Sequence, residues 1–511
     1  MLQTDLITPA ANIGIILPEL IVAFTGVVVM VYDSFFPNKR LVTGALALIG
    51  LTASGIALAS LYGGGQPSTS WNGMIAHDNL RLSFSFVFLF VSAITVLVSS
   101  VWVDREDVPA GEYHALLMFA TFGMMMMSAG NDLVVIFLGL ETLSISTYVM
   151  AGLRKSDLKS NESSMKYFIL GSFASAFLLY GMALVYGATG STALNEIAAK
   201  ISDANFPALL LIGAAMMIVG FGFKIAMAPF HVWTPDVYEG APSPVTGFMA
   251  TGPKAAAFAS FLRVFVLGMP LVAGVQASVS LHQTWITAIA VLAMASMIVG
   301  NVAAILQNNI KRMLAYSSIA HAGYALVGFV GAGMARTAQD RDAAIAAVAF
   351  YMLTYAVTNL GAFAIVTQLS QKNDRRAEFD DYNGIGFRSP VLAFSLTLFM
   401  LSLLGIPLTA GFMGKVLVFL PALQANSTLL NVLVVVAVVN TAISAYYYLR
   451  LVVVMFFRER TTDWVNPAMP AGMAAALILT VAGVLYFGIF SNGVIERFSH
   501  QPAASVVAVD R

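Results

Sequence analysis

The sequence predicts an all-α polytopic membrane protein with about fourteen transmembrane helices in one membrane domain, residues 1–511. Its composition is 59% hydrophobic and only 10% charged, whereas about a quarter of the residues of a soluble domain are charged. Runs of about 20 apolar residues, the length that crosses a bilayer, follow one another with short polar stretches between them. Such a chain cannot cover a water-facing surface, so we expect the lipid bilayer to be its solvent.

The apolar runs place the expected spans in order along the chain. The first run contains Pro18 and Glu19, and no basic segment of the kind found in cleaved signals precedes it, so we expect a retained helix. The expected centres are Ala23, Gly50, Val91, Ala120, Glu141, Phe173, Ile218, Phe258, Val291, Val327, Thr358, Leu404, Val438 and Ala482.

The distribution of basic residues predicts the orientation of these spans. With fourteen spans both termini lie on one side, and the positive-inside rule places the more basic loops in the cytoplasm. We therefore expect both termini to be periplasmic. One set of loops holds Lys39, Arg40, Arg105, Arg154, Lys155, Lys159, Lys311, Arg312, Lys372, Arg375, Arg376, Arg388, Arg458 and Arg460, and the other holds only Arg81, Lys200, Arg336, Arg341, Arg497 and Arg511.

Other features exclude several classes of function. The chain has no cysteine, which excludes disulfides and thiolate-bound metals or clusters. The formal net charge is zero, so nothing indicates a nucleic-acid partner. His231 and His321 do not group with carboxylates at metal-ligand spacing, and no phosphate-binding glycine loop is present.

Four ionisable residues fall deep inside expected spans: Glu141, Lys224, Lys254 and Lys415. A charge at the centre of a bilayer costs at least about 2.5–3.5 kcal/mol on insertion scales, and such residues mark ion pathways. A buried lysine can load and release a proton, which an arginine cannot. The sequence therefore predicts a path for a small cation, most simply a proton.

Two of these lysines adjoin breaks in their helices. Pro229 follows Lys224, and Pro407 precedes Lys415; proline removes a backbone donor and disrupts the preceding turn. Broken membrane helices occur where protein or water satisfies the freed groups. We therefore expect hydrated cavities beside both lysines, in helices 7 and 12.

A short repeat accompanies the breaks. A Gly-Phe pair stands four and three residues before each of these two lysines. The two lysines are five spans apart, an odd offset that reverses orientation. The sequence thus predicts two inverted five-helix repeats: helices 4–8 in residues 113–268 and helices 9–13 in residues 284–457.

Simpler interpretations exist for single residues. Each buried lysine could pair with an acid to fix helix packing, and Lys166 could mark the interfacial end of its span. His321 could be a satisfied packing histidine. The run Tyr446–Tyr447–Tyr448 is typical of an interfacial aromatic belt.

Two long motifs resemble a known family. Residues 224–242, KIAMAPFHVWTPDVYEGAP, are similar to the seventh-helix motif of the antiporter-like subunits of respiratory complex I. Residues 309–324, NIKRMLAYSSIAHAGY, are similar to the tenth-helix motif, and Gly139-Leu140-Glu141 matches the fifth-helix glutamate. The likeness extends over nearly the whole chain.

The details favour the subunit N branch of that family. Lys415 argues against subunit M, which typically has glutamate there. The chain ends soon after the last expected span, whereas subunit L typically continues into a long lateral helix. The segment from Ser164 to Phe168 also looks like subunit N.

The resemblance implies a role for each site residue. Glu141 and Lys224 would form a coupling ion pair, Lys254 a central relay and Lys415 the terminal proton site. His321 would connect the centre with Lys415, and Lys166 is a further candidate. These six residues would carry proton transfer: Glu141, Lys166, Lys224, Lys254, His321 and Lys415.

The resemblance also implies the setting. The chain would be a proton-translocating subunit of an NADH-quinone oxidoreductase in the bacterial cell inner membrane. Its partners would be other membrane subunits, namely antiporter-like subunit M and those on the side of the small subunit K. We expect no cofactor in this chain, because NADH, FMN, iron–sulfur clusters and quinone would bind to partner subunits.

Two alternatives remain open. The chain could belong to a cation/proton antiporter that works without redox input, or it could only anchor a membrane assembly. The residues do not decide between H⁺ and Na⁺, although no carboxylate-rich cation site is evident.

Overall fold

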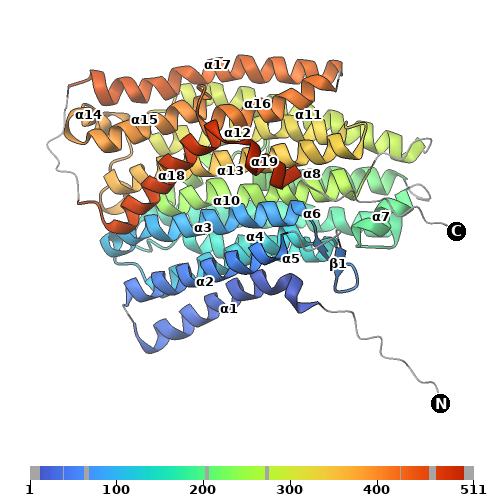
Figure 1. Cartoon of the computed structure of the whole chain (residues 1–511), viewed down its shortest axis with the longest axis horizontal. Helices are drawn as coiled ribbons and strands as arrows, with labels where there is room; N and C mark the ends of the chain where they lie inside the picture. Colours follow the sequence, from blue (N-terminus) through green and yellow to red (C-terminus); the bar gives the residue numbers. More distant parts are fainter. Residues whose placement is uncertain are drawn as a thin grey trace.

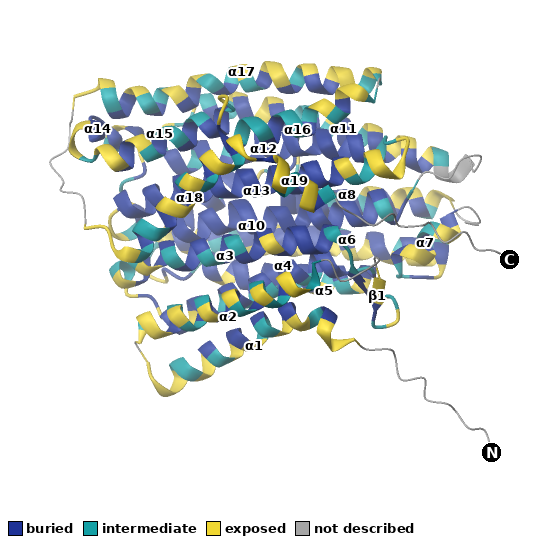
Figure 2. Ribbon diagram, in the orientation of Figure 1, coloured by how far each residue is buried: buried dark blue, intermediate teal, exposed yellow. Residues whose placement is uncertain are grey.

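The computed structural model describes residues 12–37, 39–62, 68–201, 207–270, 276–425, 427–459 and 468–499. Long helices lie side by side, with α1 and α2 along one edge and α17 along the opposite edge (Figure 1). Residues of α10, α12 and α13 are almost entirely buried, whereas α1 and α17 expose apolar side chains (Figure 2). This pattern is typical of a membrane bundle whose outer helices contact lipid.

The elements follow one another in the expected order. Helices dominate the described chain, and one short antiparallel hairpin joins α2 to α3. The elements are α1 (Ile13–Phe35), α2 (Arg40–Leu61), β1 (Ser68–Ser70), β2 (Ile75–His77), α3 (Asn79–Glu106), α4 (Ala110–Ala129), α5 (Leu133–Ala151), α6 (Leu158–Thr189), α7 (Leu194–Lys200), α8 (Pro207–Ile225), α9 (Thr234–Gly240), α10 (Ser243–Leu262), the π-helix η2 (Arg263–Leu267), α11 (Gln276–Ile305), α12 (Ile310–Gly333), α13 (Ala338–Leu369), the 3₁₀ turns η3 (Lys372–Asp374) and η4 (Phe379–Tyr382), α14 (Ile385–Arg388), α15 (Pro390–Leu404), α16 (Ala410–Gln424), α17 (Thr428–Phe457), α18 (Ala471–Ile489) and α19 (Asn492–Ser499).

The predicted membrane fold is confirmed. Within the described residues, eleven helices are long and apolar enough to cross a membrane. Helices α4 and α10 have 20 residues each and are less apolar, and α15 and α16 are shorter apolar helices. Every expected span centre falls in a helix. The count of fourteen spans and the inverted repeats stay predictions.

Polar side chains begin several of the helices. Asp78, Asp132 and Asp157 each accept a hydrogen bond from a backbone N–H in the first turn of α3, α5 and α6. Asn309 does the same for α12, accepting from two N–H groups. Since the first turn of a helix has unpaired N–H groups, such residues stabilise its start. They fix where each span begins.

Facing glycines bring two helix pairs close together. Gly123 of α4 and Gly139 of α5 are so near that a Cβ on Gly123 would lie 2.6 Å from the carbonyl oxygen of Gly139. Gly181 of α6 and Gly213 of α8 face each other in the same way. Small residues permit this approach in membrane bundles. The first contact holds α5, which carries Glu141, against α4.

The bundle has two distinct ends. We call the end with Arg154, Lys311 and Asp374 the basic end, because these side chains meet there. The opposite end, with the β1–β2 hairpin and Asp132, is the hairpin end. The chain termini, residues 1–11 and 500–511, lie outside the described residues, so their expected periplasmic position stays a prediction.

Several basic residues assigned to loops from the sequence are in fact buried. Arg81 lies inside α3, is fully buried and pairs with Glu19 of α1 at 2.7 Å. Arg154 and Lys311 are also buried, on charged partners at the basic end. Hydropathy separates charged from apolar segments, but it does not show which charged side chains have partners inside the bundle.

Candidate functional site

The break after Lys224 frees the end of a helix in the bundle interior. Helix α8 ends at Ile225, and Ala226 has a positive φ of 59°. The carbonyl of Phe223 accepts from the backbone N–H of Ala226 and from the indole Nε1 of Trp233, each over 3.1 Å. The N–H of Met227 donates to the carbonyl of Gly222 over 2.8 Å. The backbone and Trp233 thus both satisfy carbonyls at the end of the interrupted helix.

Lys224 lies in an aromatic pocket rather than in an ion pair. Its side chain is buried, and its Nζ lies 5.2 Å from the ring centre of Tyr148 and 5.4 Å from that of Tyr167. Ring faces attract a cation, but less than a contacting carboxylate does. Among the described side chains, Nζ has no hydrogen-bond partner.

The predicted Glu141–Lys224 ion pair is therefore not a direct contact. No ion pair within 4.0 Å joins them in the described part of the chain, and Oε1 of Glu141 is buried without a hydrogen-bond partner there. Their helices, α5 and α8, are joined through α6, which packs against both. The sequence placed both residues in the membrane correctly but could not give the distance between their side chains.

Lys254 contacts the middle of another helix. Its Nζ donates to the backbone carbonyl of Ser318 over 2.7 Å and contacts the hydroxyl of the same residue. Its side chain is 1% exposed. A carbonyl and a hydroxyl accept from an ammonium group without fixing its charge, so Lys254 has no acid holding its proton in place.

A chain of hydroxyl and imidazole groups begins beside this contact. The neighbouring Ser317 is hydrogen-bonded to the phenol of Tyr448. That phenol lies 3.2 Å from Nε2 of His321, and Nδ1 of His321 lies 2.7 Å from the phenol of Tyr351. Each group can both donate and accept a hydrogen bond. His321 is therefore a link in a polar chain as well as a packed residue.

Tyr448 also corrects a prediction. The predicted interfacial belt of three tyrosines is wrong for two of them, because Tyr447 and Tyr448 are buried and only Tyr446 is exposed. Consecutive residues on a helix point about 100° apart, so a run of one residue type cannot all face the same surroundings. The phenol of Tyr447 donates to Asn301 over 2.9 Å.

Lys415 closes the second helix break. Helix α15 ends at Leu404, Gly405 and Leu408 adopt positive φ, and α16 begins at Ala410. Nζ of Lys415 donates to the freed carbonyls of Leu403 and Leu404 over 3.1 and 2.9 Å. The carboxyl end of a helix attracts a cation. The break thus supplies the partner of the lysine.

Tyr324 connects Lys415 with the polar chain. Its ring centre lies 4.7 Å from Nζ of Lys415, and it packs edge-on against the imidazole of His321. Its phenol accepts from Asn301 over 3.0 Å. Buried side chains thus lie between Lys254 and Lys415, and the step from His321 to Lys415 consists of ring contacts. The sequence analysis did not single out Ser317, Ser318, Tyr324 or Tyr351, although all but Tyr351 lie in or end the tenth-helix motif.

Lys166 lies apart from the buried lysines and from the polar chain. Its side chain is 39% exposed and pairs with Glu162 at 2.7 Å and with Asp236 at 2.6 Å. Arg312 pairs with the same Asp236 at 2.8 Å. This surface network fits the interfacial position considered from the sequence, and it does not bring Lys166 to the buried lysines.

Comparison with known proteins gives the family. The model of the NADH:quinone oxidoreductase/Mrp antiporter transmembrane family matches residues 130–484, which include Glu141, Lys224, Lys254 and Lys415. The chain belongs to this family. Its resemblance to the antiporter-like subunits is thereby confirmed.

Curated relatives and solved structures of the family match over nearly the full length. NADH-quinone oxidoreductase subunit N of Trichlorobacter lovleyi is 42% identical over 95% of this chain and 96% of the relative. A chain of respiratory complex I from Thermus thermophilus with bound aureothin is 35% identical, with a TM-score of 0.75 over 94% of this chain and 98% of that one. A chain of the Mrp complex from a Dietzia species shares the fold, with a TM-score of 0.78 at 18% identity over 96% of each chain.

Proposed function

We propose that the chain is subunit N of a bacterial NADH-quinone oxidoreductase and moves protons across the membrane. The observation that carries this proposal is a buried row of side chains. It begins with Lys254 on Ser318 and continues from the neighbouring Ser317 through Tyr448 to His321. The ring of Tyr324 lies between His321 and Lys415. The names and lengths of the curated relatives support the proposal.

The residues would divide the work along the row. Glu141 and Lys224 would receive the signal from the neighbouring subunit by a change in charge. The gap between them suits this role, because two charges without a direct contact interact over distance in a medium of low dielectric. Lys254 would take up the proton and Lys415 would release it through the break between α15 and α16.

The proposal also places the chain in its assembly. The basic end would face the cytoplasm of a bacterial inner membrane and the hairpin end the periplasm, with both termini there. Its neighbours would be other membrane subunits, namely antiporter-like subunit M and those on the side of the small subunit K. NADH, FMN, iron–sulfur clusters and quinone would bind to other subunits.

The test is a substitution of Lys254 in the assembled complex. Lys254→Met removes the titrating group and keeps an unbranched side chain. We expect NADH oxidation by the hydrophilic subunits to remain, while quinone-coupled proton pumping into vesicles falls at least tenfold. The exposed Lys155 gives the control variant Lys155→Met, with normal pumping. Normal pumping by Lys254→Met in a complete complex would refute the proposal.

The alternative is an antiporter subunit without redox input, favoured by the shared fold of the Mrp complex chain. Purification from the native membrane separates the two. Subunits with flavin and iron–sulfur clusters accompany the chain in an oxidoreductase and are absent from an antiporter.

A further inference from the structure

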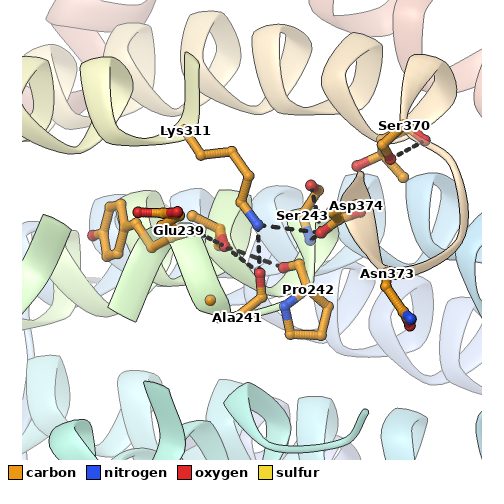
Figure 3. Close-up of polar contacts among 12 residues, drawn as sticks. Glu239, Ala241, Pro242, Ser243, Lys311, Ser370, Asn373 and Asp374 are labelled. Atoms are coloured by element: carbon orange, nitrogen blue, oxygen red, sulfur yellow. Dashed lines mark hydrogen bonds and ion pairs between the residues drawn. The ribbon is translucent and has the colours of Figure 1, made fainter. Parts of the chain in front are cut away.

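A buried lysine outside the proposed row lies at the basic end. Lys311 is the second residue of α12 and is 1% exposed. Its side chain points towards the start of α10 (Figure 3), where Nζ donates to the carbonyl of Ala241 over 2.6 Å and to Oδ2 of Asp374 over 3.1 Å. Burying an ammonium group costs free energy that a single acid partner need not offset. We therefore ask what function Lys311 could have at this position.

Asp374 joins the beginnings of two helices. Its Oδ2 accepts from the backbone N–H of Ser243 over 3.0 Å and from the hydroxyl over 2.9 Å (Figure 3). Ser243 is the first residue of α10, so the carboxylate stabilises that end of the helix. Because Lys311 binds the same carboxylate, α10 and α12 begin at one shared group.

These two helices meet again at Lys254. Lys311 and Ser318 are seven residues apart on α12, which is two turns and about 10 Å on the same face. Lys254 of α10 reaches that face at Ser318. The phenol of Tyr238, from α9, also lies near Ser318. The α10–α12 seam thus has Lys311 at its basic end and Lys254 in its middle.

A polar cavity leads from the surface to this seam. It has a volume of about 520 Å³, and Asp374, Glu239 and Asn309 are among the residues that line it. The lining also includes Arg154 and the exposed Lys159. A cavity of this size and polarity can hold water. Asp374 therefore faces the cavity on one side and Lys311 on the other.

The charges around the pair keep the carboxylate ionised. Burial alone would raise the pKa of Asp374, but Lys311, Arg154 and Arg105 outweigh it and hold that pKa well below its usual range. The charged groups that face Lys311 are Asp374, Arg154 and Glu239, and the phenol of Tyr382 lies near Asp374. Asp374 therefore stays ionised, and Lys311 is the member of this pair left to carry an exchangeable proton.

We propose that Lys311 is the proton-loading group at the basic end of the bundle, taking protons from the Asp374 cavity and passing them along the α10–α12 seam to Lys254. This inference rests on the proposed function and adds the side and the residue at which the proton enters.

The transfer conserves protons at each step. The N–H bond of the Lys311 ammonium breaks, and its proton moves through hydroxyl groups and water of the seam to the neutral amine of Lys254. Lys311 is then a neutral amine and takes one proton from water in the cavity. Asp374 stays ionised throughout, and no electrons move.

The decisive variant is Lys311→Arg in the assembled complex. Arginine keeps the positive charge and the pairing with Asp374 but holds its proton. We expect NADH oxidation to remain and proton pumping to fall at least fivefold. The control is Lys200→Arg, because Lys200 is an exposed lysine outside the cavity, paired with Glu196; we expect normal pumping. Normal pumping by an assembled Lys311→Arg variant would overturn the inference.

A second variant covers the case in which arginine does not fit. The double substitution Lys311→Met with Asp374→Asn removes both charges of this contact. The arginines that also bind Asp374 keep an acid partner each, because Arg154 pairs with Asp157 at 3.2 Å and Arg105 with Glu106 at 3.5 Å. We expect assembly without pumping, and pumping by this variant would equally overturn the inference. If Lys254→Met pumps normally, the proposed function fails; if it stops pumping while Lys311→Arg does not, only the inference about Lys311 fails.

Discussion

The phenolic oxygen of Tyr448 lies 3.2 Å from Nε2 of His321 and joins this imidazole to Ser317 of the same helix. Tyr448 comes from α17 and the other two residues from α12. The hydroxyl is therefore a bridge between two helices as well as a member of the polar chain.

Tyr448→Phe tests this bridge. The ring, which is fully buried, keeps its packing, and only the hydroxyl is lost. We expect proton pumping to fall several-fold at unchanged NADH oxidation, and the free energy of unfolding to fall by about 1–2 kcal/mol because Ser317 and His321 lose a partner. The measurement is vesicle acidification, with thermal unfolding in detergent beside it. Tyr446→Phe, on the exposed neighbour, should change neither, and equal effects of the two variants would contradict the assignment.

Lys415 combines a structural and a functional contact, and two substitutions separate them. Lys415→Met leaves the freed carbonyls of Leu403 and Leu404 without their donor, so we expect loss of pumping together with a lower melting temperature. Lys415→Arg can still donate to both carbonyls, so we expect a melting temperature near that of the unchanged protein, again without pumping. Pumping by Lys415→Arg would show that the residue only closes the break.

The pair of Glu19 and Arg81 gives a prediction about stability alone. Both side chains are buried, and Nη2 of Arg81 contacts both carboxylate oxygens of Glu19 at 2.7 Å. Glu19→Gln leaves a buried guanidinium without its counter-charge, which we expect to lower the free energy of unfolding by about 3–5 kcal/mol. Proteolysis of α1 and thermal unfolding would detect this loss.

A control and a rescue belong to the same experiment. Glu196→Gln, in the exposed pair with Lys200, should leave the melting temperature unchanged. Glu19→Leu combined with Arg81→Met should recover most of the stability lost in Glu19→Gln. If the double variant is as unstable as the single one, the charge pair is not the cause.

The sequence predicts the membrane fold and the buried lysines for a physical reason. The cost of burying a charge in lipid acts on each residue separately, so Lys224, Lys254 and Lys415 stand out from hydropathy alone. The helix breaks after Lys224 and before Lys415 could also be predicted, because proline disrupts the backbone next to it.

The partners of those lysines could not be predicted in the same way. Lys254 binds Ser318, which is 64 residues away in the sequence. Tyrosine is common at the membrane interface, but Tyr448 lies inside the bundle. Lys311 has loop-like neighbours in the sequence but a buried position. These contacts depend on which helices pack together. The residues next to each lysine in the sequence do not show this.

The carboxylate of Asp374 gives a prediction about pH. Because its pKa in the folded protein is held below the usual range by Lys311, Arg154 and Arg105 against the effect of burial, its stabilising contribution is complete above the ordinary pKa of aspartate. The contribution disappears only when the pH falls through the lowered value. We expect Asp374→Asn to lower the melting temperature by the same amount at pH 7 and pH 5, since removing one member of a buried charge cluster costs about 3 kcal/mol.

The measurement is thermal unfolding of both proteins across this pH range. Asp380→Asn is the control, because Asp380 is exposed beside Arg458 in the same loop region and should have little effect at either pH. A difference between Asp374→Asn and the unchanged protein that closes between pH 7 and pH 5 would mean that Asp374 takes up a proton in that range. In that case the acid, rather than Lys311, would carry the proton at the basic end, and the order of transfer proposed above would have to begin at Asp374.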